Sequence, residues 1–333
     1  LSREGGQDRR SGSPQAFGCD GPWAACQQPG QLFQSPIRAD GLKHIHCTDS
    51  IGWNCAREVR PAHRYNPRMS TNLQNQVVVI TGASSGIGAA TAVACARAGM
   101  DAVLQGRDAE RLARTAADVR AAGRAAEVVA GDVTEPGLNR RLLDAAEQRL
   151  GRFDVVFANA GYGFKKPTHE LTDGELRHIF EVNFFAAHDL LAEAARRLIA
   201  ARRPGHLLMC SSALSSFTMR NFAAYSASKA AQHHFCRAMR MELRPYRIEV
   251  ASVHPITTET QFFPRAAAYS GVDPSRAASH MPRWFVQRPE TVARAIVRCL
   301  RRPRPEVWTS ATTRVLAGLM TIFPRLMDVV GRM

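Results

Sequence analysis

The chain has 333 residues, of which 45% are hydrophobic, 22% charged and 7% aromatic, and its formal net charge is +15 at pH 7. That length supports one large domain or two small ones, and that composition is typical of a globular protein. The positive charge draws attention to nucleic acid, but the arginines are scattered and lack interleaved aromatic residues, so we expect no nucleic-acid partner. No segment reaches the roughly 20 apolar residues of a membrane span, and the chain does not start with a signal-peptide pattern.

Residues 1–70 differ from the rest of the chain, because they are rich in Gly, Pro, Gln, Ser and Arg and show no sustained period of 2 or 3.6. We interpret them as a disordered leader or as translated upstream sequence, since Met69 opens a stretch that looks like a natural start. The remaining residues, 71–333, have the length of one domain.

The cysteines divide between these two regions. Four lie before residue 70 without a CxxC pair, so a zinc site is weakly supported there and we predict no metal. The others lie in apolar or helical contexts and are expected to be buried thiols in a reducing compartment, which favours a cytoplasmic location: Cys95, Cys210, Cys236 and Cys299. His233 and His234 are adjacent on a predicted helix, so they point in different directions and are interpreted as surface or packing residues.

From residue 76 onward, strand and helix patterns alternate. Short apolar segments predict strands at 76–81, 102–106, 125–131, 153–159, 206–211 and 247–253. Helical patterns separate them, at 88–99, 110–123, 138–150, 175–199 and 224–244, and Gly99 and Gly123 are expected to end the first two. Strands that are nearly all apolar and are separated by helices indicate a parallel sheet covered on both faces, so we predict a single Rossmann-like, doubly wound α/β domain.

The segment TGASSGIG, residues 81–88, directly follows the first predicted strand. In such a sheet this loop faces the ligand crevice, and its glycines let the chain turn sharply and let a phosphate approach the backbone. The helix that begins near Ile87 presents N–H groups and the positive end of its dipole, so a pyrophosphate fits there. The spacing is Gly82-x-x-x-Gly86-x-Gly88 rather than G-x-G-x-x-G, and the alternative is a glycine turn without a ligand.

Further motifs follow this loop in order. They are Asp132 after the third strand, Asn159-Ala160-Gly161 after the fourth, Asn183 in the long helix, Ser212, and a Y-x-x-x-K pair at Tyr225 and Lys229, with Ser212 thirteen residues before the tyrosine. In these motifs the chain resembles the compact single-domain branch of the short-chain dehydrogenase/reductase family, over about residues 74 to 310. It departs from the family pattern at Ile256, where glycine is usual after His254-Pro255, and at Ala158, which shortens the Asn-Asn-Ala-Gly form.

The resemblance implies an oxidoreductase that transfers hydride between a nicotinamide and a carbonyl or secondary alcohol. It also implies that Ser212 hydrogen-bonds the carbonyl oxygen, that Lys229 binds the nicotinamide ribose, and that Asn183 holds a water in a proton relay with Lys229. The cofactor-binding residues that it implies are Gly82, Ser84, Ser85, Gly86, Ile87, Gly88, Arg107, Asp132, Val133, Asn159, Ala160, Gly161, Tyr225, Lys229, Pro255 and Thr260.

Tyr225 and Lys229 are i and i+4 on a predicted helix, so they share a face. An ammonium within about 4–6 Å can lower the tyrosine pKa from near 10 by roughly 1–3 pH units, and the tyrosine could then exchange a proton with the substrate oxygen. The alternatives are an exposed surface pair for these two residues, a turn cap for Ser212 with Ser211 as its neighbour, and an amide satisfied by helix packing for Asn183.

The end of the second predicted strand bears on the choice of cofactor. A site that prefers NAD(H) uses a carboxylate there. Here the position is Gly106, followed by Arg107, whose guanidinium can bind a 2′-phosphate through two parallel hydrogen bonds. Asp108 is better explained as the N-cap of the next helix, and Ser85 in the loop is neutral. We therefore predict that NADP(H) is preferred, with Arg107 as the discriminator; the alternative is a solvated helix-start arginine.

Residues 256–288 follow the sixth strand and are predicted to cover the crevice as a lid. Their aromatic residues and a methionine favour a lipophilic substrate, or ordinary packing of a short helix pair: Phe262, Phe263, Tyr269, Met281, Trp284 and Phe285. The apolar segment 314–333, with its flanking arginines, fits packing on the lid or on a second subunit, or peripheral contact with a membrane surface. We predict a homo-oligomer.

These features predict an NADP(H)-dependent carbonyl reductase or alcohol dehydrogenase. One alternative is a catalytically silent nucleotide-binding protein with the same fold, against which the tyrosine, lysine and serine argue. Another is an extended-family epimerase or dehydratase, against which the glycine spacing and the short C-terminal part argue.

Overall fold

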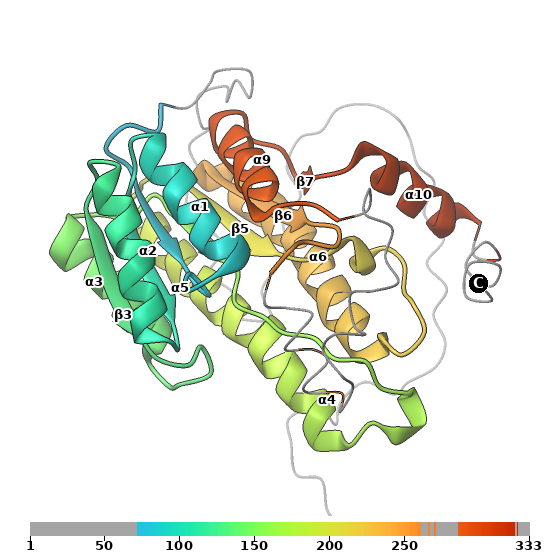
Figure 1. Ribbon diagram of the computed structural model, residues 1–333. Coiled ribbons are helices and arrows are strands. Elements are labelled where there is room, and N and C mark those ends of the chain that lie inside the picture. The colour runs from blue at the N-terminus through green and yellow to red at the C-terminus, as the bar shows by residue number, and fades with distance from the viewer. Residues whose placement is uncertain (1–71, 261–265, 267–269, 271–285, 324, 326–333) are drawn as a thin grey trace, which may run out of the picture. The chain divides into compact units, whose positions relative to one another are not determined.

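The computed structural model describes residues 72–260, 266, 270, 286–323 and 325. Within them the strands form a parallel sheet in the order β3-β2-β1-β4-β5-β6-β7 (Figure 1). The strands are β1 Val77–Ile80, β2 Asp101–Gly106, β3 Ala126–Ala130, β4 Val155–Ala158, β5 Gly205–Cys210, β6 Ile248–His254 and β7 Glu306–Trp308. This arrangement confirms the predicted Rossmann-like, doubly wound fold.

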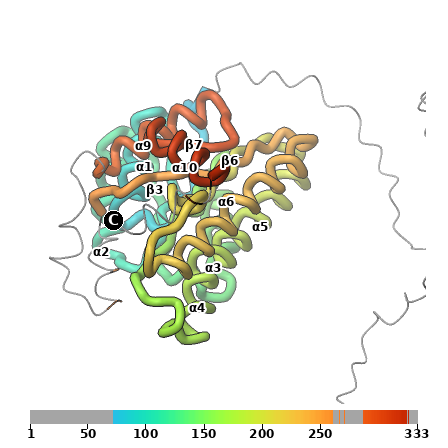
Figure 2. The backbone as a smooth tube through the Cα atoms, turned by 90° about the vertical axis from the view of Figure 1, so that its right-hand side faces the viewer, coloured from blue at the N-terminus to red at the C-terminus, as the bar shows by residue number. Residues whose placement is uncertain are grey.

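Helices cover both faces of the sheet, which explains why its central strands are apolar along their whole length. One face shares a hydrophobic core with α1 Gly86–Arg97, α2 Ala109–Ala121 and α9 Pro289–Arg301. The other packs against α3 Leu138–Leu150, α5 Ala186–Ala200 and α6 Ala223–Leu243. Figure 2 shows α3, α5 and α6 together on one side of the strands, with α1 and α9 on the other.

All six predicted strands are present, and their ends differ from the predicted ends by at most two residues. β7 was not predicted. It pairs in parallel with β6, from Ser252 opposite Glu306 to His254 opposite Trp308. Its three residues are too few to carry a pattern of alternation, and they are held in place by the neighbouring strand rather than by their own sequence.

The segment 175–199, expected as one helix, is divided. Its first part belongs to α4, Asp173–Phe180, which starts with a capping box formed by Thr172 and Glu175. A π-helical turn, Glu181–Phe185, then leads into α5. Within this turn the backbone N–H of Ala186 bonds to the carbonyl of Glu181, five residues earlier. Such turns interrupt helices most often at functional sites, and this one carries Asn183.

The two ends of the predicted lid lie side by side. The N–H of Glu259 donates to the Gln287 carbonyl and the N–H of Gln287 donates to the Thr257 carbonyl, both at 2.9 Å. The lid residues from Phe262 to Phe285 on which the prediction of a lipophilic substrate rests lie outside the described residues, as do residues 1–70.

The last described helix is α10 Ala311–Ile322, which follows β7 (Figure 1). It buries one face and exposes the other. Thr313, Ala317 and Met320 are buried, whereas Val315 and Ile322 are more than 60% exposed. No helix in the described part of the chain is long and apolar enough to cross a membrane.

Candidate active site

The predicted site residues meet where the order of the strands reverses, between β1 and β4. In a doubly wound sheet this point opens a crevice beyond the carboxyl ends of the strands. The glycine loop leaves β1 here, Asn159-Ala160-Gly161 leaves β4, and Ser212 follows the end of β5. The sheet therefore brings together residues that lie far apart in the sequence.

The glycine loop is closed too tightly for larger residues at two positions. Gly82 has a φ of +65°. A Cβ added to Gly88 would lie 2.3 Å from the carbonyl oxygen of Gly82 and 2.7 Å from Nδ2 of Asn159. The first turn of α1 follows this close approach directly, so its backbone N–H groups face the crevice and fit an anionic group such as a pyrophosphate.

Polar side chains fasten this loop to the neighbouring strands. The Asn159 amide donates to the Thr81 carbonyl at 2.9 Å and to the Gly82 carbonyl at 3.3 Å. The Thr81 hydroxyl accepts from the backbone N–H groups of Asn159 and Ala160, both at 3.0 Å. Buried Gln105 accepts from the Gly82 N–H at 3.2 Å and donates to the Gly131 carbonyl at 2.7 Å. Gln105 was not predicted from the sequence, where a glutamine within an apolar strand was the available signal, and Thr81 was predicted only as the first residue of the glycine segment.

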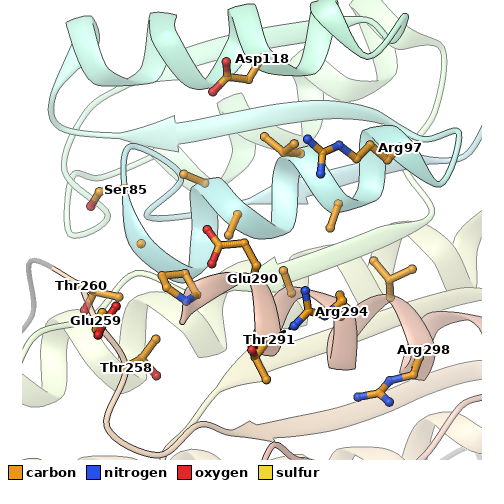
Figure 3. A pocket seen from close by; sticks show the side chains of 18 of the residues that line it. Ser85, Arg97, Asp118, Thr258, Glu259, Thr260, Glu290, Thr291, Arg294 and Arg298 are labelled. Atoms are coloured by element: carbon orange, nitrogen blue, oxygen red, sulfur yellow. Dashed lines mark hydrogen bonds between the residues drawn. The ribbon is translucent and has the colours of Figure 1, made fainter. Parts of the chain in front are cut away.

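A groove begins at the glycine loop and runs between α1 and α9 (Figure 3). Ser85, Gly86 and Thr260 line its loop end. Thr260 packs so closely that its Cγ2 would lie 2.8 Å from a Cβ added to Gly86. Neither Tyr225 nor Lys229 lines this groove, so it adjoins the cofactor loop without containing the candidate chemistry.

The other side chains of the loop, and Asp108 after β2, contact neighbouring elements. Ser84 lies beside Gly106 at the end of β2, 3.2 Å from the place of a Cβ there, and Ile87 packs against the core. Asp108 caps α2 as predicted, accepting a hydrogen bond from the Arg111 N–H at 3.0 Å.

Arg107 and Asp132 approach each other across the ends of β2 and β3. Nη1 of Arg107 lies 3.5 Å from Oδ2 of Asp132, and their side chains are 61% and 40% exposed. Burial acts to raise the pKa of Asp132, but hydrogen bonds from Thr134 and the charge of Arg107 outweigh burial and hold that pKa below its usual value. Val133, the next residue, is half-buried. The arginine is thus exposed and only loosely paired.

Ser212, Tyr225 and Lys229 are brought together, and all three are buried. Nζ of Lys229 lies 5.7 Å from the centre of the Tyr225 ring and donates to the Cys210 carbonyl at 2.7 Å. The side chain of Ser212 hydrogen-bonds that of Tyr225. The alternative of an exposed surface pair for Tyr225 and Lys229 is therefore wrong.

The predicted lowering of the tyrosine pKa is also wrong. Burial raises the pKa of Tyr225 well above its ordinary value, and the hydrogen bond with Ser212 offsets only part of this rise. The Lys229 ammonium donates to the Cys210 carbonyl and to Oε1 of Gln232, the latter at 3.0 Å. Burial also lowers the pKa of Lys229 to about 8.

Ser211 and Ser212 make different contacts. The Ser211 hydroxyl donates to the Lys229 carbonyl at 2.8 Å and is engaged within the core. Ser212 contacts Tyr225 and also caps the short helix at Ala213–Ser215, accepting from the Leu214 N–H at 3.1 Å. Ser212 is thus both a turn cap and the serine beside the tyrosine.

Asn183 is fully buried in the π-helical turn. Its Oδ1 accepts from the Tyr162 N–H at 2.9 Å, and its Nδ2 donates to the Tyr162 carbonyl and to the Ser228 hydroxyl, both at 3.0 Å. Its backbone carbonyl accepts a hydrogen bond from the side-chain amide of Gln232, a residue that the sequence analysis missed. Gly161 packs against this group, since a Cβ there would lie 3.0 Å from Oδ1 of Asn183.

The end of β6 supports the segment Ser212–Ala213, which follows β5. The Pro255 carbonyl accepts from the Ala213 N–H at 3.0 Å. His254 lies with Nδ1 3.1 Å from the Ser212 carbonyl and Nε2 2.8 Å from the Ser252 hydroxyl, and burial lowers its pKa to about 4. Ile256 is half-buried at the position where the family pattern has glycine.

Within the described ranges, one group of side chains has a spacing that a metal could use: His233, His254 and Glu306, whose ligand atoms lie within 4.8 Å of one another. Protein partners already engage these atoms, because Nε2 of His233 is 3.0 Å from Oε1 of Glu306 and His254 is held by serines. His233 faces this cluster, whereas His234 is exposed. We assign the cluster to packing behind the segment after β5 that carries Ser212.

Comparison with known proteins adds the family context. A family model described as short chain dehydrogenase matches residues 76–269. A 1-deoxy-11-beta-hydroxypentalenate dehydrogenase of Streptomyces exfoliatus is 38% identical over 192 residues, which are 57% of this chain and 70% of that protein.

Solved structures give the same match. A short-chain dehydrogenase of Mycobacterium paratuberculosis bound to NAD aligns with a TM-score of 0.62 at 25% identity, over 73% of this chain and 100% of that one. A short-chain dehydrogenase of Sphingobium yanoikuyae in complex with NADPH aligns with a TM-score of 0.63 at 28% identity, over 76% of this chain and 95% of that one.

Proposed function

The chain belongs to the short-chain dehydrogenase family, and from this premise we propose that it transfers hydride between NADP(H) and a lipophilic ketone or secondary alcohol. As a member of this family it is an NAD(P)-dependent oxidoreductase that acts on CH–OH groups. The observation that carries the proposal is the buried contact of Tyr225 with Ser212, beside Lys229 and next to the glycine loop.

The side chains divide the chemistry between them. The nicotinamide, when bound, supplies or accepts the hydride at the carbon of the substrate. In the direction of reduction, the Tyr225 phenol gives its proton to the carbonyl oxygen, and the Ser212 hydroxyl donates a hydrogen bond to that oxygen. The Tyr225 phenol is protonated at neutral pH and so has a proton to give, although burial raises its pKa and makes it a weaker acid.

Lys229 and the loop residues hold the reactants in place. The Lys229 ammonium lies between the Tyr225 ring and the end of β5, within reach of the region bordered by Gly161. From there it can bind the ribose hydroxyls of the cofactor. Asn159, Thr81 and Gln105 keep the glycine loop closed, so that the first turn of α1 stays aimed at the pyrophosphate.

Apolar side chains around the tyrosine support a lipophilic substrate. Phe164, Ile179 and Phe222 are buried in one cluster with Tyr225, and Tyr162 and Leu214 are packed against it. A relative in Streptomyces exfoliatus is named 1-deoxy-11-beta-hydroxypentalenate dehydrogenase, a name that specifies a hydroxyl-bearing substrate. We propose that this cluster forms the wall against which the apolar part of the substrate lies.

Replacing Tyr225 by phenylalanine tests the mechanism. Tyr225→Phe keeps the ring and deletes the proton donor, so turnover should fall by about 10²- to 10⁴-fold. Cofactor affinity, followed by nicotinamide fluorescence, should persist. Tyr246→Phe is the matched control. It removes the phenol of a tyrosine that is 46% exposed and lies after the end of α6, and it should keep full turnover. Near-normal turnover in Tyr225→Phe would remove this residue from the mechanism.

Arg107 supports the proposed preference for NADP(H), because it is exposed at the end of β2 and its contact with Asp132 is long. A charge-assisted contact with a 2′-phosphate corresponds to about 10- to 150-fold in affinity. We expect Arg107→Ala to weaken NADP(H) by about that factor and to leave NAD(H) nearly unchanged.

Titrating both cofactors into the wild type and the variant decides the preference. Arg114→Ala is the matched control, since it removes the same charge from an exposed ion pair with Glu110 on α2. It should leave both affinities near the wild-type values. Equal affinities for the two cofactors in the wild type would contradict the proposed preference for NADP(H).

A further inference from the structure

A buried glutamine connects the candidate lysine to the asparagine turn. Gln232 has no exposed surface and lies three residues after Lys229 on α6, so the two side chains share a helix face. Its Oε1 accepts from Nζ of Lys229 at 3.0 Å, and its Nε2 donates to the backbone carbonyl of Asn183. One amide therefore spans the gap between α6 and the π-helical turn.

The partners of this amide fix its orientation. A lysine ammonium is only a donor and a backbone carbonyl is only an acceptor, so the amide oxygen must face Lys229 and the amide nitrogen must face Asn183. The Lys229 ammonium has a second anchor, the Cys210 carbonyl at the end of β5, at 2.7 Å. The lysine is thus held from two sides, by the sheet and by the amide.

The family resemblance assigns the link between Asn183 and Lys229 to a water in a proton relay. In this chain a side chain makes that link. An amide gives up no proton near neutral pH, so it fixes position and passes no proton. A hydrogen bond from a charged donor to a buried acceptor also favours the charged form of the donor.

We propose that Gln232 is a positioning residue for the hydride-transfer reaction, a buried amide that holds the Lys229 ammonium between β5 and the Asn183 turn and keeps it charged. The proposal rests on the proposed function for its catalytic meaning, but its test measures Lys229 directly. Among the described residues, the titratable groups that face this ammonium are the Tyr225 phenol on the same helix and the Cys210 thiol on β5.

The chain is suited to a direct measurement, because it contains only four lysines: Lys43, Lys165, Lys166 and Lys229. Lysine labelled with ¹³C at Cε in the full-length protein gives one NMR signal for each, and Lys229→Met identifies the signal of Lys229. Its titration midpoint is then followed in two variants with opposite effects.

Gln232→Leu removes the acceptor and leaves a more apolar surrounding, so the midpoint for Lys229 should fall. Gln232→Glu places a carboxylate beside the ammonium, so the midpoint should rise by about one pH unit or more. Gln148→Leu, the same chemical change at an exposed position of α3, should leave the midpoint unchanged. A purely structural loss would move both Gln232 variants in the same direction.

Midpoints that stay at the wild-type value, or that move in one direction in both Gln232 variants, would overturn the proposal. If one variant does not fold, the sign of the shift in the other decides. Turnover is measured separately, and both variants should lower kcat more than they raise KM for the alcohol. If the Lys229 midpoint moves in opposite directions in the two variants but the wild type shows no turnover, the role of Gln232 at Lys229 is supported and the proposed reaction is contradicted.

Discussion

Burial favours the neutral form of both Tyr225 and Lys229, so it shifts their two pKa values in opposite directions. It raises the pKa of the phenol and lowers the pKa of the ammonium to about 8. The i, i+4 spacing on a helix predicted that the two side chains share a face, which is correct. It did not reveal how deeply α6 buries that face, and depth determines the direction of the tyrosine shift.

The lowered pKa of Lys229 predicts a pH-dependent stability. Its pKa falls from 10.5 to about 8 on folding, so between these values the unfolded chain binds more protons and the free energy of unfolding rises with pH. Below about pH 8 the folded protein must keep a buried charge. We expect the wild type to gain up to about 3 kcal/mol relative to Lys229→Met between pH 8 and pH 10.5.

Denaturant unfolding of both proteins across this pH range measures the gain. Lys165→Met, a change at an exposed lysine, is the control and should track the wild type at every pH. A difference between the wild type and Lys229→Met that stays flat from pH 7 to pH 10.5 would show that Lys229 is charged throughout, contrary to the effect of burial.

Residues that act through tertiary contacts were the ones missed. Gln105 and Gln232 belong to no spacing rule, and Thr81 opens the glycine segment but was given no role. Each is defined by partners from another element: Asn159 for Thr81, Gly131 for Gln105 and Asn183 for Gln232. A polar side chain in an apolar strand or on a buried helix face signals a need for partners, but the sequence does not say which. The motif residues were located by their spacing along the chain, and their roles are those that the family resemblance implies.

At the scale of elements, local patterns predicted strands and helix ends well and irregular turns poorly. The π-helical turn at Glu181–Phe185 lies inside a continuous helical pattern, so nothing in the period marks it. Its position follows from contacts made by Asn183 with Tyr162 and Gln232. The glycine loop, by contrast, is specified by its own residues, so the effect of replacing one of its glycines can be predicted.

Gly88→Ala tests the closure of that loop. The new Cβ would lie 2.3 Å from the Gly82 carbonyl oxygen and 2.7 Å from Nδ2 of Asn159, so the backbone must shift. Overpacking of this kind typically destabilises by about 1–3 kcal/mol. Because the shift moves the first turn of α1, we also expect cofactor affinity to fall at least about tenfold.

Gly174→Ala is the matched control, because a Cβ added there meets nothing within 4 Å and the position lies in α4. It should be neutral or stabilise the protein by up to about 1 kcal/mol through helix propensity. Thermal unfolding and nicotinamide fluorescence measure both variants. Wild-type affinity and stability in Gly88→Ala would mean that the loop opens easily and does not constrain the cofactor.

For the whole molecule, the fold could be predicted because its central strands are buried on both faces and its connections are regular. Six of the strands carry near-continuous apolar runs separated by helices, which leaves few arrangements other than a doubly wound sheet. β7 could not be predicted, because three residues at the edge depend on pairing with β6.

The start of the folded domain is a prediction at this same scale. The hydrophobic core includes Leu73, which is 3% exposed, and the hydrogen bonds of the domain include one from the Asn75 N–H to the Gly99 carbonyl at 2.8 Å. A chain that begins at Met69 keeps these contacts. We expect it to match the full-length protein in melting temperature, cofactor affinity and turnover.

A chain that begins at Gln76 provides the control, because it loses the burial of Leu73 and the contacts of Asn75 with Gly99 and Arg124. Burying one leucine stabilises a protein by about 1.5–3 kcal/mol, so the shorter chain should unfold at a clearly lower temperature. Calorimetry and turnover of the three proteins locate the boundary. If the chain from Met69 already unfolds early or loses cofactor affinity, residues 1–68 contribute to the fold and the domain begins earlier than residue 69.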